Sequence, residues 1–389
     1  MSASPEVVLE PRVLEWARNR VGLSETRLAD KVGTQAGRVL EWERTGHITL
    51  SQAQRVARAT YTPLGYLYLT QIPPEQLPVT DFRVVGDEPP ERPSPNLLDV
   101  LDGAGLRQDW YRNYLVSTGA DPLDFVGTLS ETVPVLQAAA RVRERHGLSV
   151  EQRQEANTWD DALRLETERI EQSGVLVMRS GIAGSNTRRP LDVQEFRGFV
   201  LADQYAPLIF INGCDARAAQ IFTLLHELVH LWLGQSGVSN FDRTLPNNHQ
   251  SERYCNAVAA EILVPEAALR QRWADVAGRA DGVSALGRLF KVSGLVILRR
   301  LYDARILDWS TFRARYVQEE SRYGEASARR TGGGDFYKTQ QTRLGSRFIG
   351  AVIESTLEGR TSGRDAFPLL GIKTVATFRE VARRHGFAI

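Results

Sequence analysis

The sequence has few of the features that direct a chain into a membrane or an oxidising compartment. Its 389 residues include only two cysteines, Cys214 and Cys255, too few and too far apart for a disulfide framework or a four-cysteine metal site. The first twenty residues carry acidic side chains where a signal peptide needs a basic start and an apolar core. No apolar run approaches the roughly 18 residues of a membrane-spanning helix. We therefore expect a cytoplasmic protein with two free thiols and no membrane partner.

An excess of charge is also missing. The chain has 48 Lys and Arg against 47 Asp and Glu, with 42% hydrophobic residues, which excludes wholesale disorder and a globally nucleic-acid-binding chain. A partner recognised by charge must therefore meet a local patch. From residue 321 to the end, twelve basic residues stand against six acidic ones. We interpret this basic tail as solvated surface, with an acidic protein or nucleic acid as the sharper alternative.

The length predicts several domains, and changes in composition indicate where they meet. Four prolines between Gly86 and Asn96 indicate an extended spacer. Short β-branched and aromatic runs at 174–180, 197–203 and 207–213 predict three strands, whereas the rest of the chain has helical periodicity. The predicted fold is mostly α with an α+β core that holds a small sheet. The predicted ranges are a helix-turn-helix domain at 1–75, a Pro-rich linker at 76–96, a helical connecting region at 97–165, the core at 166–270 and a helical, basic C-terminal region at 271–389.

The N-terminal segment has the spacing of a helix-turn-helix. Ser24 is placed to begin one short helix, Gly33 to form the turn, and residues 35–44 to form the second helix. The segment resembles the Cro/C1-type repressor module through its Leu-Ala pair at 28–29 and its Trp-Glu pair at 42–43.

This resemblance implies that the second helix enters the major groove of promoter DNA, with Thr34, Gln35 and Arg38 nearest the bases. Residues 1–80 hold nine basic and eight acidic side chains, whereas a DNA reader normally offers a basic face. A protein-docking module, or a bundle that only packs, therefore remains an alternative.

The most informative stretch lies between Gln220 and Gln235, where the only strongly polar side chains are His226, Glu227 and His230, with Thr223 as a mild exception. Burying such groups without partners costs several kcal/mol, which a shared metal ion would offset. Histidines four apart on a helix lie about 40° apart around its axis and about 6 Å along it, so both rings can reach one cation. Glu227, rotated by about 100°, can face a water in the open position of the metal. The spacing is the HExxH motif of zinc proteases; the alternative is a histidine pair satisfied by ordinary hydrogen bonds.

A catalytic zinc also needs a third protein ligand, and the segment at 251–266 offers Glu252 and Glu261. Nine residues place these carboxylates half a turn out of phase, so both cannot face one metal from a straight helix. Glu252 shares its face with Asn256 and Ala259, and we expect it to be the ligand. We expect the helix before it to begin with Asp215 as N-cap and to end at Gly234.

Together, "RAAQIFTLLHELVHLWLG" and "SERYCNAVAAEILVPE" resemble the bacterial ImmA/IrrE metallopeptidases over roughly residues 196–266. Cys255 and Val258 depart from that pattern, where Ala and Phe are usual. The resemblance implies Zn²⁺ bound by His226, His230 and Glu252, with Glu227 as general base. It further implies regulatory cleavage of one or few partner proteins, often a repressor. The positions that fit the pattern are Arg217, Phe222, Thr223, His226, Glu227, His230, Glu252, Asn256, Ala259, Glu261, Leu263 and Pro265.

Two matters stay open on the sequence alone. Tyr205, His249 and Tyr254 are candidates for a group that stabilises the oxyanion, and none can be preferred. The chain as a whole, with "DFR" at 81–83 and "GGGDFY" at 332–337, also resembles antitoxins that are paired with a PIN-type ribonuclease toxin. In that alternative the helical arms bind and neutralise the toxin, and the zinc site is structural or regulatory.

Overall fold

The computed structural model describes residues 4–74, 77–82, 92–239, 250–327 and 336–388. The chain divides into two compact units. Unit 1 comprises Met1–Pro78 and Glu91–Asp99, and unit 2 comprises Val79–Pro90 and Val100–Ile389. The described residues are mostly helical with a small mixed sheet, which confirms the predicted fold class. None of the described helices is long and apolar enough to cross a membrane.

Unit 1 is a small helical bundle with a two-stranded sheet. The predicted helix, turn and helix are present: the Ser24 hydroxyl accepts a hydrogen bond from the Arg27 amide, and Gly33 takes the left-handed conformation that ends the first helix. The strands β1 (Glu6–Val8) and β2 (His47–Thr49) pair antiparallel. The helices are α1 (Pro11–Asn19), α2 (Glu25–Val32), α3 (Ala36–Thr45), α4 (Leu50–Ala59) and the 3-10 turn η1 (Leu64–Tyr68).

Unit 2 is built on a five-stranded sheet with the order β3-β7-β5-β6-β4. The three predicted strands are confirmed as β4 (Leu176–Ser180), β5 (Gly198–Leu201) and β6 (Leu208–Asn212). Two three-residue strands, β3 (Thr80–Phe82) and β7 (Gly237–Ser239), were not predicted because so short a segment carries no measurable alternation. Strand β5 runs antiparallel to β6 and β7, whereas β4 is parallel to β6 and β3 is parallel to β7.

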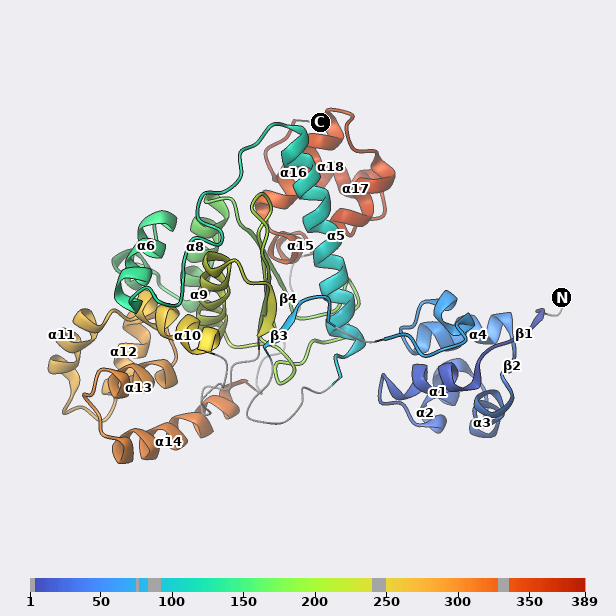
Figure 1. The fold of residues 1–389 in the computed structure, drawn as a ribbon, viewed down its shortest axis with the longest axis horizontal. Coiled ribbons are helices and arrows are strands. Elements are labelled where there is room, and N and C mark those ends of the chain that lie inside the picture. Colours follow the sequence, from blue (N-terminus) through green and yellow to red (C-terminus); the bar gives the residue numbers. More distant parts are fainter. Residues whose placement is uncertain (1–3, 75–76, 83–91, 240–249, 328–335, 389) are drawn as a thin grey trace. The chain divides into compact units, whose positions relative to one another are not determined.

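Helices cover both faces of this sheet (Figure 1). The helices α8 (Trp159–Gln172) and α9 (Arg217–Leu233) pack on one face. The helix α5 (Pro95–Ser117) crosses the other, where the Gln108 side chain donates hydrogen bonds to the carbonyls of Leu201 and Ala206. The helix α10 (Gln250–Leu263) packs against α9 and against α6 (Val135–His146).

In the C-terminal region, where the sequence predicts helices, two pairs of helices joined by short turns span 282–303 and 363–384. Within the predicted linker, residues 80–82 form β3 and α5 begins at Pro95, while residues 83–91 and most of the Gly-rich segment before Phe336 lie outside the described residues. The other helices are α7 (Val150–Glu155), α11 (Glu266–Val276), α12 (Gly282–Phe290), α13 (Gly294–Asp303), α14 (Trp309–Ser327), α15 (Phe336–Leu344), α16 (Ser346–Leu357), α17 (Gly363–Leu370) and α18 (Val375–Arg384).

Candidate metal centre

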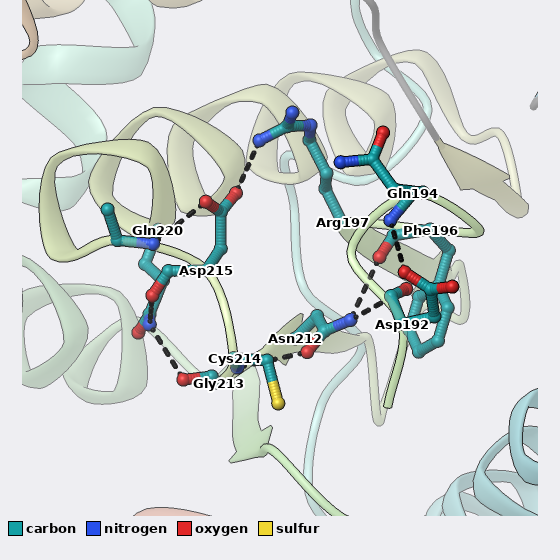
Figure 2. Close-up of polar contacts among 10 residues, drawn as sticks. Asp192, Gln194, Phe196, Arg197, Asn212, Gly213, Cys214, Asp215 and Gln220 are labelled. Carbon is teal, nitrogen blue, oxygen red and sulfur yellow. Dashed lines mark hydrogen bonds and ion pairs between the residues drawn. The ribbon is translucent and has the colours of Figure 1, made fainter. Parts of the chain in front are cut away.

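The helix that carries the two histidines is held at its start by a polar network (Figure 2). Gln220 donates hydrogen bonds back to the carbonyls of Gly213 and Asp215, at 3.2 and 2.6 Å. Asn212, the last residue of β6, donates to the carbonyls of Asp192 and Phe196 and accepts from the Cys214 amide. The loop from β6 into α9 is therefore fixed, and α9 cannot shift along the sheet without breaking these bonds.

The predicted N-cap of this helix is wrong. Helix α9 begins at Arg217, Ala216 is its N-cap, and no side chain caps it. The Asp215 carboxylate forms an ion pair with Arg197 at 2.6 Å, and Arg197 immediately precedes β5. The sequence could not show that the Asp215 carboxylate pairs with an arginine that lies before another strand of the sheet. The predicted end at Gly234 is confirmed, because Gly234 is left-handed with φ 71°.

Helices α9 and α10 bring His226, His230 and Glu252 together. The Nε2 atoms of the two imidazoles are 3.0 Å apart. The Glu252 carboxylate lies 3.3 Å from His226 Nε2 through Oε2 and 2.9 Å from His230 Nε2 through Oε1. All three side chains have 0% of their surface exposed.

This arrangement fits a zinc ion. Ligand bonds of about 2.0–2.2 Å in a tetrahedral site separate the ligand atoms by roughly 3.3–3.6 Å, so the observed 2.9–3.3 Å needs only a small expansion. Two imidazoles and one carboxylate are also the donor set of many catalytic zinc sites, with the fourth position left open. In the described part of the chain, these three residues are the only group of three or more His, Cys, Asp and Glu side chains with this proximity.

The electrostatics of the three residues suit a cation. Burial lowers the pKa of His226 and so favours the neutral imidazole that binds metals. Burial alone would raise the pKa of Glu252, but the imidazoles of His226 and His230 outweigh it and hold that pKa well below its usual range. The carboxylate is therefore ionised where a metal ligand must be.

Glu227 lies beside the three residues but does not join them. Its side chain is fully buried. Burial and the negative charge of Glu252 raise the pKa of Glu227 well above its usual range, and the Ser239 hydroxyl offsets part of this rise. Gly198 of β5 makes room for the carboxylate, since a Cβ there would stand 2.9 Å from Glu227 Oε1.

Two further residues belong to the site, and no pattern in the sequence points to either. The Gln235 side chain lies 3.2 Å from His230 Nδ1 through its Oε1 atom, so it can fix the tautomer that turns Nε2 toward Glu252. Ser239, the last residue of β7, is fully buried beside Glu227. Both follow the helix in the chain and meet it only through the turn at Gly234 and the pairing of β7.

The second glutamate of α10 has a different role. Glu261 forms a buried ion pair with Arg300, and its carboxylate also accepts the amide of Glu266. Arg153 donates to the carbonyl of Leu263, the last residue of α10, and Arg300 donates to the carbonyl of Val264, which follows it. The half-turn offset between the two glutamates therefore has the consequence that the sequence predicts: one faces the imidazoles and the other faces away.

The two described candidates for an oxyanion-stabilising group have their contacts away from the three ligand side chains. The Tyr254 hydroxyl donates to the Val133 carbonyl at 2.8 Å, and the Tyr205 ring lies beneath the Arg112 guanidinium. His249 lies outside the described residues.

The predicted DNA-contacting residues lie at the turn between α2 and α3. Thr34 is in the turn, Gln35 is the N-cap of α3, and Arg38 is half-exposed and forms an ion pair with Glu41 at 2.6 Å. Their role in DNA binding stays a prediction.

Comparison with protein families supports the resemblance for the segment that carries the site. Residues 170–302 match peptidase family M78, described as the IrrE N-terminal-like domain. The match covers roughly a third of the chain and includes β4 to β6, α9 and α10, with all four site residues. Residues 344–384, which hold α16 to α18, match a domain family of unknown function, DUF8813. No curated protein matches the chain.

Proposed function

We propose that the protein is a zinc-dependent metallopeptidase of regulatory type that cleaves one or few partner proteins, such as a repressor. The observation that carries the proposal is the convergence of the ligand atoms of His226, His230 and Glu252 within 4.8 Å of one another, with the fully buried carboxylate of Glu227 beside them. The match to a peptidase family over the same residues supports it.

Each residue has a role in peptide hydrolysis. His226, His230 and Glu252 would hold Zn²⁺, which when bound supplies Lewis acidity toward the scissile carbonyl and toward a water. Glu227 takes the proton of the attacking water on a carboxylate oxygen and delivers it to the leaving amine nitrogen. The raised pKa of Glu227 suits the second half of this transfer, in which the carboxyl holds the proton before it passes to the amine.

The substitution Glu227→Gln tests this assignment. The variant should bind one zinc per chain like the wild type, because Glu227 is not a ligand, and it should lose cleavage of β-casein and of any protein that co-purifies with the chain. Glu266→Gln, at an exposed glutamate that pairs with Arg270, is the matched control and should leave both measurements unchanged. Loss of zinc from Glu227→Gln, or retained zinc-dependent cleavage, would contradict the role.

A second candidate function rests on the complete burial of the four side chains. Structural zinc sites are closed, whereas catalytic sites keep an open position. The chain would then act by binding, as an antitoxin that neutralises a PIN-type ribonuclease, with promoter DNA bound through Thr34, Gln35 and Arg38. Co-expression with the product of the neighbouring gene separates the two: protection by Glu227→Gln equal to that of wild type favours binding alone.

A further inference from the structure

Under the proposed peptidase function, on which this inference rests, a peptide must reach four side chains that are completely buried. His226, Glu227, His230 and Glu252 all have 0% of their surface exposed. A scissile carbonyl must come within contact distance of Glu227 and of the metal position. Some part of the fold must therefore give way before a substrate binds.

The strand beside Glu227 is β5. A Cβ at Gly198 would stand 2.9 Å from Glu227 Oε1 and 2.6 Å from the Thr223 methyl carbon, so the backbone of β5 passes directly against these side chains. A peptide that adds to the sheet along β5 would bring its own backbone next to Glu227. Extended peptides bind to sheet edges in this way through main-chain hydrogen bonds.

One side of β5 cannot be vacated. Its neighbour β6 is five residues long and entirely buried, and it continues into α9 through the loop that Gln220 and Asn212 hold. Displacing β6 would displace the helix that carries His226 and His230. A peptide therefore has to approach from the other side.

That other side is covered by two short strands. The strand β7 pairs with β5 over three residues, with Ser239 opposite Gly198, and Val238 is the only large apolar side chain that it contributes to the core. The strand β3 pairs with the outer edge of β7 over three residues, and its Thr80 is exposed. Short edge strands are the least stable part of a sheet, since few ladder hydrogen bonds hold them.

The geometry points to the β7-facing edge of β5 as the peptide-binding edge of the site, occupied in this conformation by the chain's own β7 and β3. The ligand that fits is an extended, unstructured peptide segment, recognised mainly through its main chain. Displacement of β7 and β3 opens the edge, so the protein is closed to folded proteins and to most peptides until that pair is released.

Two double substitutions in the full-length protein test the inference. Thr80→Pro with Asp81→Pro removes backbone donors from β3 and adds rings that do not fit a ladder, whereas Thr80→Ala with Asp81→Ala keeps the donors and removes only the side chains. Zinc content is measured first, and thermal unfolding confirms that each variant folds. A fluorescein-labelled peptide hydroxamate, which combines an extended backbone with a zinc-binding group, is then titrated by anisotropy. Hydrogen exchange at Val238 and Ser239 reports on β7 independently.

We expect the proline variant to bind the hydroxamate at least tenfold more tightly than wild type, with faster exchange at Val238 and Ser239. The alanine variant should stay within about twofold of wild type. Equal binding by all three zinc-loaded proteins, or no binding by any of them, would overturn the inference, as would unchanged exchange in the proline variant. If none of the three proteins contains zinc before the probe is added, the result contradicts the proposed peptidase function itself. The proposed peptide-binding edge then loses its basis as well.

Discussion

Each end of α10 carries a buried glutamate, and the two glutamates differ in the groups that face them. Glu252, near the start of the helix, is buried against two imidazoles, whereas Glu261, near its end, is buried against the Arg300 guanidinium. Glu261 thus has a permanent cation within the chain. The Glu252 carboxylate faces two imidazoles, which are neutral when they are ready to bind a metal, and burial lowers the pKa of His226 toward that state.

This difference explains why only one of the two carboxylates forms a candidate site. A buried carboxylate without a compensating cation is costly, and the chain meets that cost at Glu261 by itself. At Glu252 the compensation is left to a ligand. The two glutamates also distinguish the ends of α10. The end near Glu261 is fixed, because Arg153 and Arg300 donate hydrogen bonds to the carbonyls of Leu263 and Val264, and the end near Glu252 carries the candidate site.

The largest effect is expected at the fixed end. Arg300→Ala leaves Glu261 buried without its cation and the Val264 carbonyl without its donor, which should lower the free energy of unfolding by about 3–5 kcal/mol. Urea denaturation of the apo protein measures this. Arg299→Ala is the matched control, because the neighbouring arginine is half-exposed in an ion pair with Asp303 and should cost less than about 1 kcal/mol. Equal losses in the two variants would show that burial of the pair is not what stabilises α10.

A third buried carboxylate, that of Glu171 in α8, extends the comparison of buried glutamates, because its burial makes the stability of the protein depend on pH. It lies against the start of α16, where a Cβ on Gly345 would stand 2.5 Å from its Oε1, and burial raises its pKa from 4.5 to about 7. The folded state therefore binds a proton that the unfolded state releases near pH 4.5. Stability should fall as pH rises from about 4.5 through about 7, by about 2–3 kcal/mol in total.

Glu171→Gln should remove that fall and make the variant the more stable protein at pH 8. Thermal unfolding from pH 5 to pH 8 measures the difference. Asp160→Asn, at an exposed carboxylate at the other end of the same helix, should keep the wild-type profile. A pH profile of Glu171→Gln that matches wild type would mean that the amides and guanidinium of α16 keep Glu171 ionised throughout.

The sequence predicts those features of the fold and site that depend on the spacing of residues within one helix or strand. It does not predict those that depend on contacts between segments far apart in the chain. The four-residue spacing of the histidines and the nine-residue spacing of the glutamates fix their faces on two helices, so the candidate ligands could be named in advance. Asp215 is expected to be a cap because it precedes the helix, but its carboxylate pairs with Arg197, which immediately precedes β5. The strands β3 and β7 come from segments more than 150 residues apart, and their pairing leaves no periodic signal.

The smallest expected effect tests whether the functional end of α10 depends on support from α9. Gln235 follows the left-handed Gly234, and its amide oxygen lies 3.2 Å from His230 Nδ1. Gln235→Leu removes that acceptor and should weaken zinc affinity by about 10–100-fold, since a partner on the second ring nitrogen orients a ligating histidine. Gln235→Glu keeps an acceptor and should bind zinc at least as tightly as wild type. Competition with a chromophoric chelator measures all three proteins, and unfolding of the apo forms shows whether the fold is preserved. If the Gln235→Leu and Gln235→Glu variants bind zinc with equal affinity, packing alone orients His230. The zinc affinity of the site then does not depend on the residue that follows α9.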